Sequence, residues 1–379
     1  MTSSPTSLAA TTDVNDKKTI RWGIVGLGDV CQKKSGPAFY KCEGSALVAV
    51  MRRTAGKAAA FAENVPSQIV SNQSISCVGY DDLDSFLNHP EMDAVYVSTR
   101  PGTHLEICEK VAMAGKACYV EKPVGRCAEE TKRIVELFEK ANLPLYTAYI
   151  SRAYDRTQAV RKLLKDGAIG KTLNSVSYHL IGSGGARGMD EDELPWRLDA
   201  KQSGGGLIMD VGCHILDRID YICGPLTNVK GTADNRNSPS IAVEDYVHIN
   251  ALIGKGSWAA IPGSVGAQVD CTWEFVSEKD PIDELVFEGP NGKIKLEGMN
   301  PCGPVSVLDE NGTVIHELSF QMPEHTAQQL IQSVVNDLRG ERDVPDFISK
   351  GANAIRTQIV LDQALQEFYG GRAPGFWLK

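Results

Sequence analysis

Three polar residues carry the side chains best suited to moving a proton. Lys122 stands just past the predicted strand 117–120, where open α/β sheets bind their ligands. Asp210 and His214 are four residues apart on a predicted helix, so their side chains should share one face. A histidine is the usual acid or base near neutral pH, a carboxylate can orient its ring, and an ammonium can stabilise an oxygen that gains charge. This set suits the oxidation of an alcohol or the reverse reaction.

The spacing alone leaves a structural explanation open. A lysine at a strand end is commonly solvated, and a carboxylate and a histidine one turn apart can form a pair on a helix surface. The case for chemistry therefore depends on the elements that place these side chains relative to one another.

Strands and helices alternate regularly in the first part of the chain. Short β-rich apolar runs are predicted at 19–26, 46–51, 94–98, 117–120 and 145–149, with helices at 55–62, 103–114 and 129–141 between them. Such alternation produces a parallel sheet with helices on both faces. We expect a doubly wound α/β domain over residues 19–149, preceded by a polar, disordered tail at 1–18.

After residue 150 strands cluster together with few helices between them. Strands are predicted at 173–181, 246–252, 257–261, 268–275, 284–288 and 293–296, and helices at 157–165, 206–222, 324–338 and 351–368. The stretch Glu288-Gly-Pro-Asn-Gly292 is typical of a hairpin turn. Residues 150–379 are therefore predicted to form an α+β domain with a large, mostly antiparallel open sheet.

Composition excludes several classes of partner. The net charge of −9 argues against nucleic acid, and no apolar run approaches the roughly 20 residues that span a bilayer. The ten cysteines contain no C-x-x-C pair, so neither a zinc site nor a disulfide framework is expected. We predict reduced thiols in a cytoplasmic protein without a bound metal.

The first strand ends in a nucleotide-binding pattern. Gly26-Leu27-Gly28-Asp29-Val30-Cys31 matches G-x-G-x-x-G/A with a small cysteine in the third position. The first glycine permits a tight turn, the second lets the backbone approach a pyrophosphate, and the helix that follows presents free N–H groups. These residues are predicted to bind a dinucleotide, as in a Rossmann domain.

The end of the second strand indicates which dinucleotide. NAD enzymes place an acid there to bind the ribose hydroxyl, yet this segment reads Met51-Arg52-Arg53-Thr54 with no acid from 47 to 62. Two guanidinium groups and a hydroxyl suit a 2′-phosphate. We predict that NADP(H) is favoured over NAD(H); the alternative is a solvated strand end.

Several further segments resemble one enzyme family. They are Ser98-Thr99-Arg100-Pro101-Gly102-Thr103-His104, Glu121-Lys122-Pro123, Pro195-Trp196-Arg197 and Gly204-Gly-Gly206 leading into Asp210-Val-Gly-Cys-His214. In this order they resemble the Gfo/Idh/MocA family, which includes glucose–fructose oxidoreductase, inositol dehydrogenases and dihydrodiol dehydrogenases. The resemblance extends from Thr19 to Lys379. Arg100 departs from it, because the family more often has proline after the threonine.

The resemblance implies a role for each matching residue. Lys122, Asp210 and His214 would be catalytic and would contact the substrate, while Thr99, Pro101, His104, Glu121, Lys122, Trp196 and Arg197 would contact the cofactor. Arg152 lies at the predicted junction of the domains and is expected to reach the substrate too. His104 could instead be structural, Trp196 a core residue and Arg197 a surface residue.

The implied function is NAD(P)-dependent hydride transfer to or from a hydroxyl or carbonyl of a sugar, polyol or related cyclic alcohol. Two alternatives stay open at this point: a glycosidase that oxidises its sugar transiently, and a cofactor-sensing regulator without catalysis. The family resemblance also implies a homo-oligomer, a dimer or tetramer.

Overall fold

The computed structural model describes residues 18–70, 73–182, 195–238 and 240–378. The first sheet has six parallel strands in the order β5-β2-β1-β6-β7-β8. Their bounds are β1 (Ile20–Val25), β2 (Ser45–Met51), β5 (Val78–Tyr80), β6 (Ala94–Val97), β7 (Ala117–Val120) and β8 (Leu145–Thr147). This is the predicted doubly wound arrangement, with β5 as an unpredicted edge strand. The tail predicted at 1–18 lies, except for Lys18, outside the described residues.

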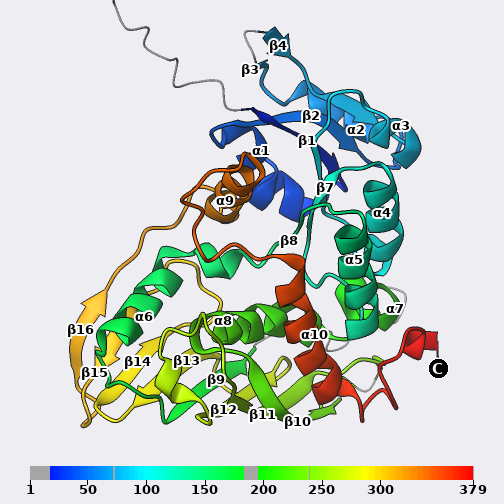
Figure 1. Ribbon diagram of the computed structural model, residues 1–379. Helices are drawn as coiled ribbons and strands as arrows, with labels where there is room; N and C mark the ends of the chain where they lie inside the picture. The colour runs from blue at the N-terminus through cyan, green and yellow to red at the C-terminus, as the bar shows by residue number, and fades with distance from the viewer. Residues whose placement is uncertain (1–17, 71–72, 183–194, 239, 379) are drawn as a thin grey trace, which may run out of the picture.

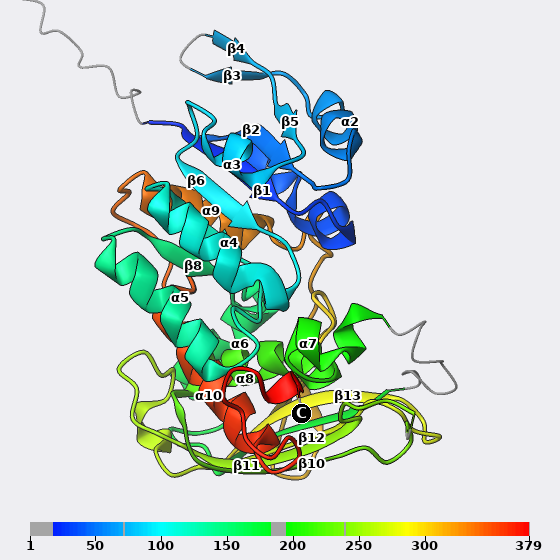
Figure 2. The same ribbon diagram turned by 90° about the vertical axis from the view of Figure 1, so that its right-hand side faces the viewer.

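Helices cover both faces of this sheet, which explains why its strands are continuously apolar. On one face, α4 (Pro101–Met113) and α5 (Ala128–Lys140) lie side by side, whereas α1 (Ala38–Lys41) and α9 (Gln328–Leu338) lie on the other (Figures 1 and 2). Short elements complete the unit: α2 (Lys57–Glu63), α3 (Leu83–Leu87) and the hairpin β3 (Gln68–Val70) and β4 (Gln73–Ile75).

Helix α9 packs where its sequence position does not suggest. It belongs to the segment assigned to the second domain, yet Leu330, Ile331 and Val334 are fully buried in one cluster with Trp22 and Phe39 of the first unit. The chain thus returns to the first sheet near its end, and the two units are interleaved there.

The second sheet has eight strands in the order β10-β11-β12-β9-β13-β14-β15-β16. Their bounds are β9 (Ser175–Ile181), β10 (Leu226–Asp234), β11 (Tyr246–Ile253), β12 (Gln268–Glu274), β13 (Ile282–Gly289), β14 (Gly292–Leu296), β15 (Val305–Leu308) and β16 (Val314–Leu318). Every neighbouring pair is antiparallel except β9 with β12. The predicted open, mostly antiparallel sheet is therefore present.

The strand predicted at 257–261 is wrong. These residues form a turn and irregular chain, and Trp258 donates its indole N–H to the carbonyl of Asp220 at 2.8 Å. The carbonyl of Trp258 accepts a hydrogen bond from Arg161, and the guanidinium of Arg356 lies 4.5 Å from the centroid of the Trp258 ring. Contacts with a helix end, not a ladder, therefore satisfy this apolar segment.

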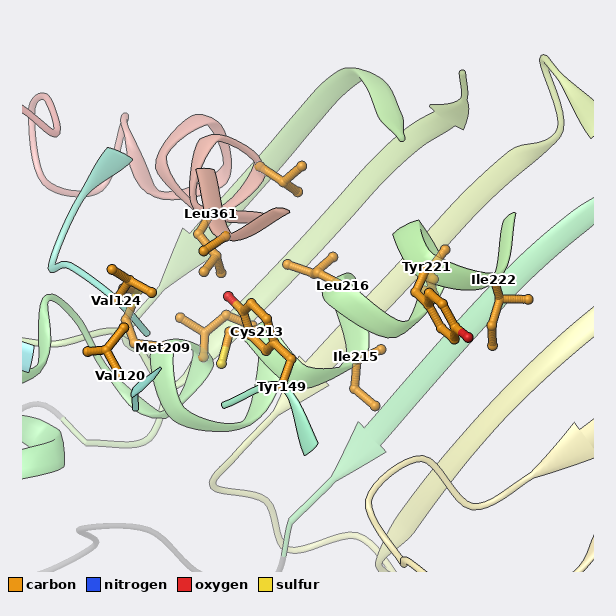
Figure 3. Close-up of a cluster of buried hydrophobic side chains, with 14 of the residues drawn as sticks. Val120, Val124, Tyr149, Met209, Cys213, Ile215, Leu216, Tyr221, Ile222 and Leu361 are labelled. Atoms are coloured by element: carbon orange, nitrogen blue, oxygen red, sulfur yellow. The ribbon is translucent and has the colours of Figure 1, made fainter. Parts of the chain in front are cut away.

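One face of the second sheet is covered by α6 (Asp155–Asp166), α8 (Cys213–Cys223) and α10 (Gly351–Leu365) (Figure 1). Helix α8 is buried along its whole length, with Cys213, Ile215 and Leu216 in the cluster of Figure 3 that also contains Leu361 of α10. The helix predicted at 206–222 is split: a π-helical turn, Ile208–Gly212, precedes α8. No helix in the described part of the chain is both long and apolar enough to cross a membrane.

Candidate active site

A cavity of about 1060 Å³ lies between the carboxyl ends of the first sheet and the loops above the second. All six parallel strands contribute to it, because a segment that lines the cavity follows each strand. These segments are Gly26–Val30, Met51–Thr54, Asp81–Leu83, Ser98–Arg100, Glu121–Lys122 and Ala148–Ile150. Within them, only Leu27 and Tyr149 do not line the cavity. The opposite wall contains Trp196, Arg197, Gln202, Asp210, Val211, His214, Met299 and Ala327. This is the ligand-binding edge of an open α/β sheet.

The glycine turn after β1 is built for close approach of a ligand. Gly26 has a φ of +93°, and a Cβ on it would lie 2.5 Å from the carbonyl oxygen of Ser98, so only glycine fits. Gly28 differs, since apart from its two chain neighbours no described residue comes within 4 Å of a Cβ placed there. The space beside Gly28 therefore suits a ligand's phosphate, with Cys31 fully buried behind it as the small third residue.

The end of the cavity that β2 and β5 supply presents both positively charged and acidic side chains. Arg53 and Thr54 are exposed and line it, while Arg52 donates from Nη1 to the carbonyl of Leu27 at 2.9 Å. Asp81 and Asp82 follow β5 and line the same end, although the sequence patterns did not identify them. An acid is thus supplied here by the edge strand rather than by β2.

At the other end three charged side chains form one network. Lys122 donates from Nζ to Asp210 Oδ1 at 2.5 Å and to the Asp210 carbonyl at 3.0 Å. Arg197 donates from Nε to Asp210 Oδ2 at 2.7 Å, so both carboxylate oxygens are engaged. The network joins segments that are 88 residues apart in sequence.

This network fixes the charge of its members. Burial by itself lowers the pKa of Lys122, but the Asp210 carboxylate outweighs burial and leaves that pKa raised. Burial raises the pKa of Asp210, yet Lys122 and Arg197 together hold it well below the usual range. Lys122 is therefore an ammonium and Asp210 a carboxylate throughout the neutral pH range.

His214 lies in the same cavity but is not paired with Asp210. Burial first, and then the positive charges of Lys122 and Arg218, lower the pKa of His214 well below 6.5, so its ring is neutral. Its Nδ1 has no hydrogen-bond partner among the described residues, and its ring meets that of Tyr149 edge-on at 6.3 Å. The prediction that Asp210 orients the His214 ring is wrong, because the Asp210 carboxylate is bonded to Lys122 and Arg197 instead. The π-helical turn that contains Asp210 changes the angle between the two side chains around the helix axis.

Comparisons with known proteins identify the family of this chain. Residues 20–149 match the family described as "Oxidoreductase family, NAD-binding Rossmann fold", and residues 157–282 match the GFO/IDH/MocA C-terminal domain. The chain belongs to the GFO/IDH/MocA family of oxidoreductases.

Individual members of the family show how far the similarity extends. Oxidoreductase P35 from Formosa agariphila is 28% identical over 88% of this chain and 95% of its own length. The dTDP-3,4-didehydro-2,6-dideoxy-alpha-D-glucose 3-reductase of Saccharopolyspora spinosa is 30% identical, but over 56% of this chain and 58% of its own. The crystal structure of the aldose-aldose oxidoreductase from Caulobacter crescentus, complexed with glycerol, shares the fold with a TM-score of 0.73 at 22% identity, covering 94% and 98% of the two chains.

A chain of hydrogen bonds in the protein interior connects the two ends of this cavity. Glu121 accepts from the hydroxyl of Tyr96 at 2.6 Å, and that hydroxyl lies 2.9 Å from Ser35, in the helical turn after the glycine loop. Burial raises the pKa of Glu121, and the neighbouring Lys122 opposes this. Glu121 thus fixes the position of the strand end that carries Lys122.

Three of the predicted cofactor contacts do not line the cavity. Leu27 has a buried side chain, and Pro101 forms the first turn of α4. His104 is fully buried, with its ring nitrogens 3.1 Å from the Val124 carbonyl and 3.2 Å from that of Thr99. Burial lowers the pKa of His104, and the contacts with the Thr99 and Val124 carbonyls only partly oppose this effect. These residues support the lining; Thr99, Trp196 and Arg197 belong to it.

The expected substrate contact of Arg152 needs correction. Its guanidinium forms two hydrogen bonds to Asp217, at 2.7 Å from Nε and 2.6 Å from Nη2, and both residues are buried outside the cavity lining. Burial lowers the pKa of Arg152, but Asp217 outweighs that effect and leaves it raised. The Asp217 carboxylate neutralises the Arg152 guanidinium in this buried bidentate pair, so Arg152 has a structural role.

Other lining residues escaped the sequence analysis. Lys34 and Ser35 follow the glycine turn by one helical turn, which the adjacent lysines could have indicated. Met299 and Ala327 come from loops far along the chain, and no local pattern distinguishes them. Among the described residues, no cluster of His, Cys, Asp and Glu could hold a metal ion.

Proposed function

We propose that this protein transfers a hydride between a nicotinamide cofactor and a hydroxyl or carbonyl carbon of a sugar, polyol or related cyclic alcohol. One observation carries the proposal: the same cavity has a nucleotide-type glycine turn at one end and a charged Lys122 beside a neutral His214 at the other. The sugar reductase and the aldose oxidoreductase among the relatives support the substrate class.

The residues of the cavity fit a dinucleotide. The turn at Gly26 and Gly28 would hold the pyrophosphate, and the lining from Ser98 to Lys122 would face the nicotinamide. When bound, the nicotinamide supplies or accepts the hydride. For the adenosine end we propose a preference for NADP(H), because Arg53 and Thr54 are free to meet a 2′-phosphate there.

The chain's own groups then divide the work on the proton. In the oxidation direction the neutral His214 accepts the proton of the substrate hydroxyl, while the Lys122 ammonium donates a hydrogen bond to the same oxygen as its charge develops. In the reduction direction the protonated His214 returns that proton to the carbonyl oxygen, while the Lys122 ammonium donates a hydrogen bond to the same oxygen. Asp210 holds the ammonium of Lys122 in place and Arg197 holds the Asp210 carboxylate, so both act as positioning residues.

A screen of sugars, inositols and dihydrodiols with NADP and NAD tests the proposal. We expect one class of substrate to generate net reduced nicotinamide, followed by its absorbance, or to consume it in the reverse direction. A glycosidase of the transient-oxidation kind would convert sugar without net change in the cofactor. A cofactor sensor would bind NADP or NAD and convert nothing, and either result would refute the proposal. A cytoplasmic location and a homodimer or homotetramer remain predictions, to be checked by fractionation and by light scattering.

A further inference from the structure

Two fully buried arginines lie behind the catalytic end of the cavity. Arg218 is 1% exposed and Arg156 0%. The Nη2 of Arg218 donates to the carbonyl of Gly298, and Arg156 donates to the carbonyls of Glu297 and Asn300. Three of their nitrogens have no partner among the described residues: Nε and Nη1 of Arg218, and Nε of Arg156. The buried Arg161 also has an unpartnered Nε, but its Nη1 is bonded to the Asp346 carboxylate. A buried guanidinium with free N–H groups is costly, so a function is the natural explanation.

The remaining buried arginines show what is missing. Arg152, Arg161 and Arg372 each bond to a carboxylate, those of Asp217, Asp346 and Asp362 respectively. Arg156 and Arg218 have only backbone carbonyls, and no carboxylate within ion-pair distance occurs in the described residues. Burial lowers the pKa of Arg218, and it lowers that of Arg156 to about 10, whereas the pKa of Arg152 is raised by its partner.

The acids nearby are already engaged. Asp283 accepts from the Tyr178 hydroxyl at 2.8 Å and from the backbone N–H groups of Gly298 and Met299 at 2.9 and 2.7 Å. The side chain of Glu297 is exposed and accepts from Asn300 at 2.6 Å. These carboxylates fix the 297–300 loop and do not pair with the arginines.

The arginine pair lies behind residues that line the substrate end of the cavity, and neither arginine belongs to the lining itself. His214 lines the cavity, and Arg218 follows it by one turn of α8 and contributes to its lowered pKa. Met299, which also lines the cavity, stands between the carbonyls that hold the two arginines. The buried Tyr154 lies within electrostatic range of Lys122 as well as of both arginines.

We propose that Arg218 and Arg156, together called the floor, bind a carboxylate on the substrate, so that the preferred substrate is a sugar acid such as a hexuronate. The proposal rests on the function proposed above and specifies its substrate class. The carboxylate would accept hydrogen bonds from the free nitrogens of Arg218, with the charge of Arg156 behind it, and the flexible Met299 would yield to admit it.

A carboxylate suits this floor better than a phosphate. It has one charge and two oxygens, which three free nitrogens can satisfy, whereas a phosphate ester brings nearly two charges and three oxygens. Asp283 and Glu297 remain within electrostatic range of Arg156, and they would repel the second charge. The recognised group is therefore a single carboxylate held one helical turn from His214.

Calorimetric titration of the cofactor-loaded protein tests this assignment. The probes are D-glucuronate, D-galacturonate and D-mannuronate, each with its parent hexose and the corresponding hexose phosphate. We expect one hexuronate to bind about tenfold or more tightly than its parent, the effect of a hydrogen bond to a charged group. Arg218→Gln should abolish this preference and Arg156→Gln should weaken it, with cofactor affinity unchanged. The control Arg161→Gln, in the same helix as Arg156 but paired with Asp346, should retain the preference.

Two outcomes would overturn the inference while the proposed function survives. One is a neutral hexose or hexose phosphate that exchanges a hydride and binds as tightly as the uronate. The other is a uronate preference that persists in Arg218→Gln. If no sugar, acidic or neutral, exchanges a hydride with the cofactor, the proposed function fails and the inference fails with it.

A stability measurement without ligand gives a second, independent test. Because Arg218 carries a buried charge with no carboxylate beside it, Arg218→Met should leave the melting temperature unchanged or raise it. Arg152→Met should lower it, since Asp217 would lose its buried partner. A melting temperature that falls as far in Arg218→Met as in Arg152→Met would make Arg218 a structural residue and contradict a ligand site.

Discussion

The two ends of the cavity are constructed in different ways. At the nucleotide end, backbone turns after β1 and β2 supply the lining, and each turn lies within one short sequence segment. At the substrate end, side chains from the first sheet, the π-helical turn and α8 meet, and Lys122 and Asp210 are 88 residues apart.

The difference shows what sets a residue's role at each end. A glycine at Gly26 or Gly28 acts through space and φ, so its role follows from local geometry. The charge and orientation of the Lys122, Asp210 and His214 side chains depend on which residues surround each one in the folded chain. Substitutions at the substrate end should therefore change chemistry, whereas those at the nucleotide end should change cofactor affinity.

The largest effect is expected at His214. His214→Ala removes the group that accepts the hydroxyl proton, so turnover in the oxidation direction should fall by a factor of about 100 to 10,000 with cofactor affinity retained. Because the pKa of His214 lies well below 6.5, the wild-type rate should decline only when the pH falls beneath that ordinary value and the ring becomes charged. Steady-state rates against pH should show that the acid limb disappears in the variant. An acid limb that persists in His214→Ala would assign it to another group.

Lys122→Met should have the next largest effect. The ammonium stabilises charge that develops only in the transition state, so turnover should drop by about 100- to 1,000-fold, or about 3–4 kcal/mol of barrier. Asp210 keeps Arg197 as a partner, so the fold should be preserved. Lys132→Met, at an exposed position on α5, is the control. Loss of cofactor binding rather than turnover would place Lys122 at the nucleotide end of the comparison.

A smaller effect is expected at Arg53, and there on affinity alone. Arg53→Ala should weaken NADP(H) binding by about 1.5–3 kcal/mol, the range for a lost hydrogen bond to a charged group, and leave NAD(H) binding unchanged. Fluorescence titration of both cofactors measures this, with the exposed Arg133→Ala of α5 as control. Tighter binding of NAD(H) by the wild-type protein would show that Asp81 or Asp82 determines the cofactor instead.

The sequence predicted the first sheet well because its strands are buried on both faces and read as uninterrupted apolar runs. The sequence analysis missed β10, β15 and β16, which lie at or beside the edges of the second sheet. In β10 and β15 polar residues interrupt the run of apolar residues, and in β16 most side chains are exposed. The apolar 257–261 segment misled the prediction because Trp258 packs on helix ends.

The site was predicted where motifs are local and not where partners are distant. Asp210 was correctly placed in the cavity but given the wrong partner, since helical spacing cannot reveal that Lys122 and Arg197 approach it. Arg152 and Arg218 look alike in sequence, yet Asp217 neutralises one and nothing described neutralises the other. Only the folded chain distinguishes a structural arginine from one free to bind a ligand.

Isotope transfer tests the central claim most directly. The protein would be incubated with oxidised cofactor and a perdeuterated form of whichever sugar acid or sugar the screens identify, and the nicotinamide would be recovered and analysed by NMR and mass spectrometry. The account predicts one deuterium on the nicotinamide ring for each sugar oxidised, in wild type and, far more slowly, in Lys122→Met. A reduced nicotinamide without deuterium, or sugar turnover with no label transferred, would contradict hydride exchange at this site.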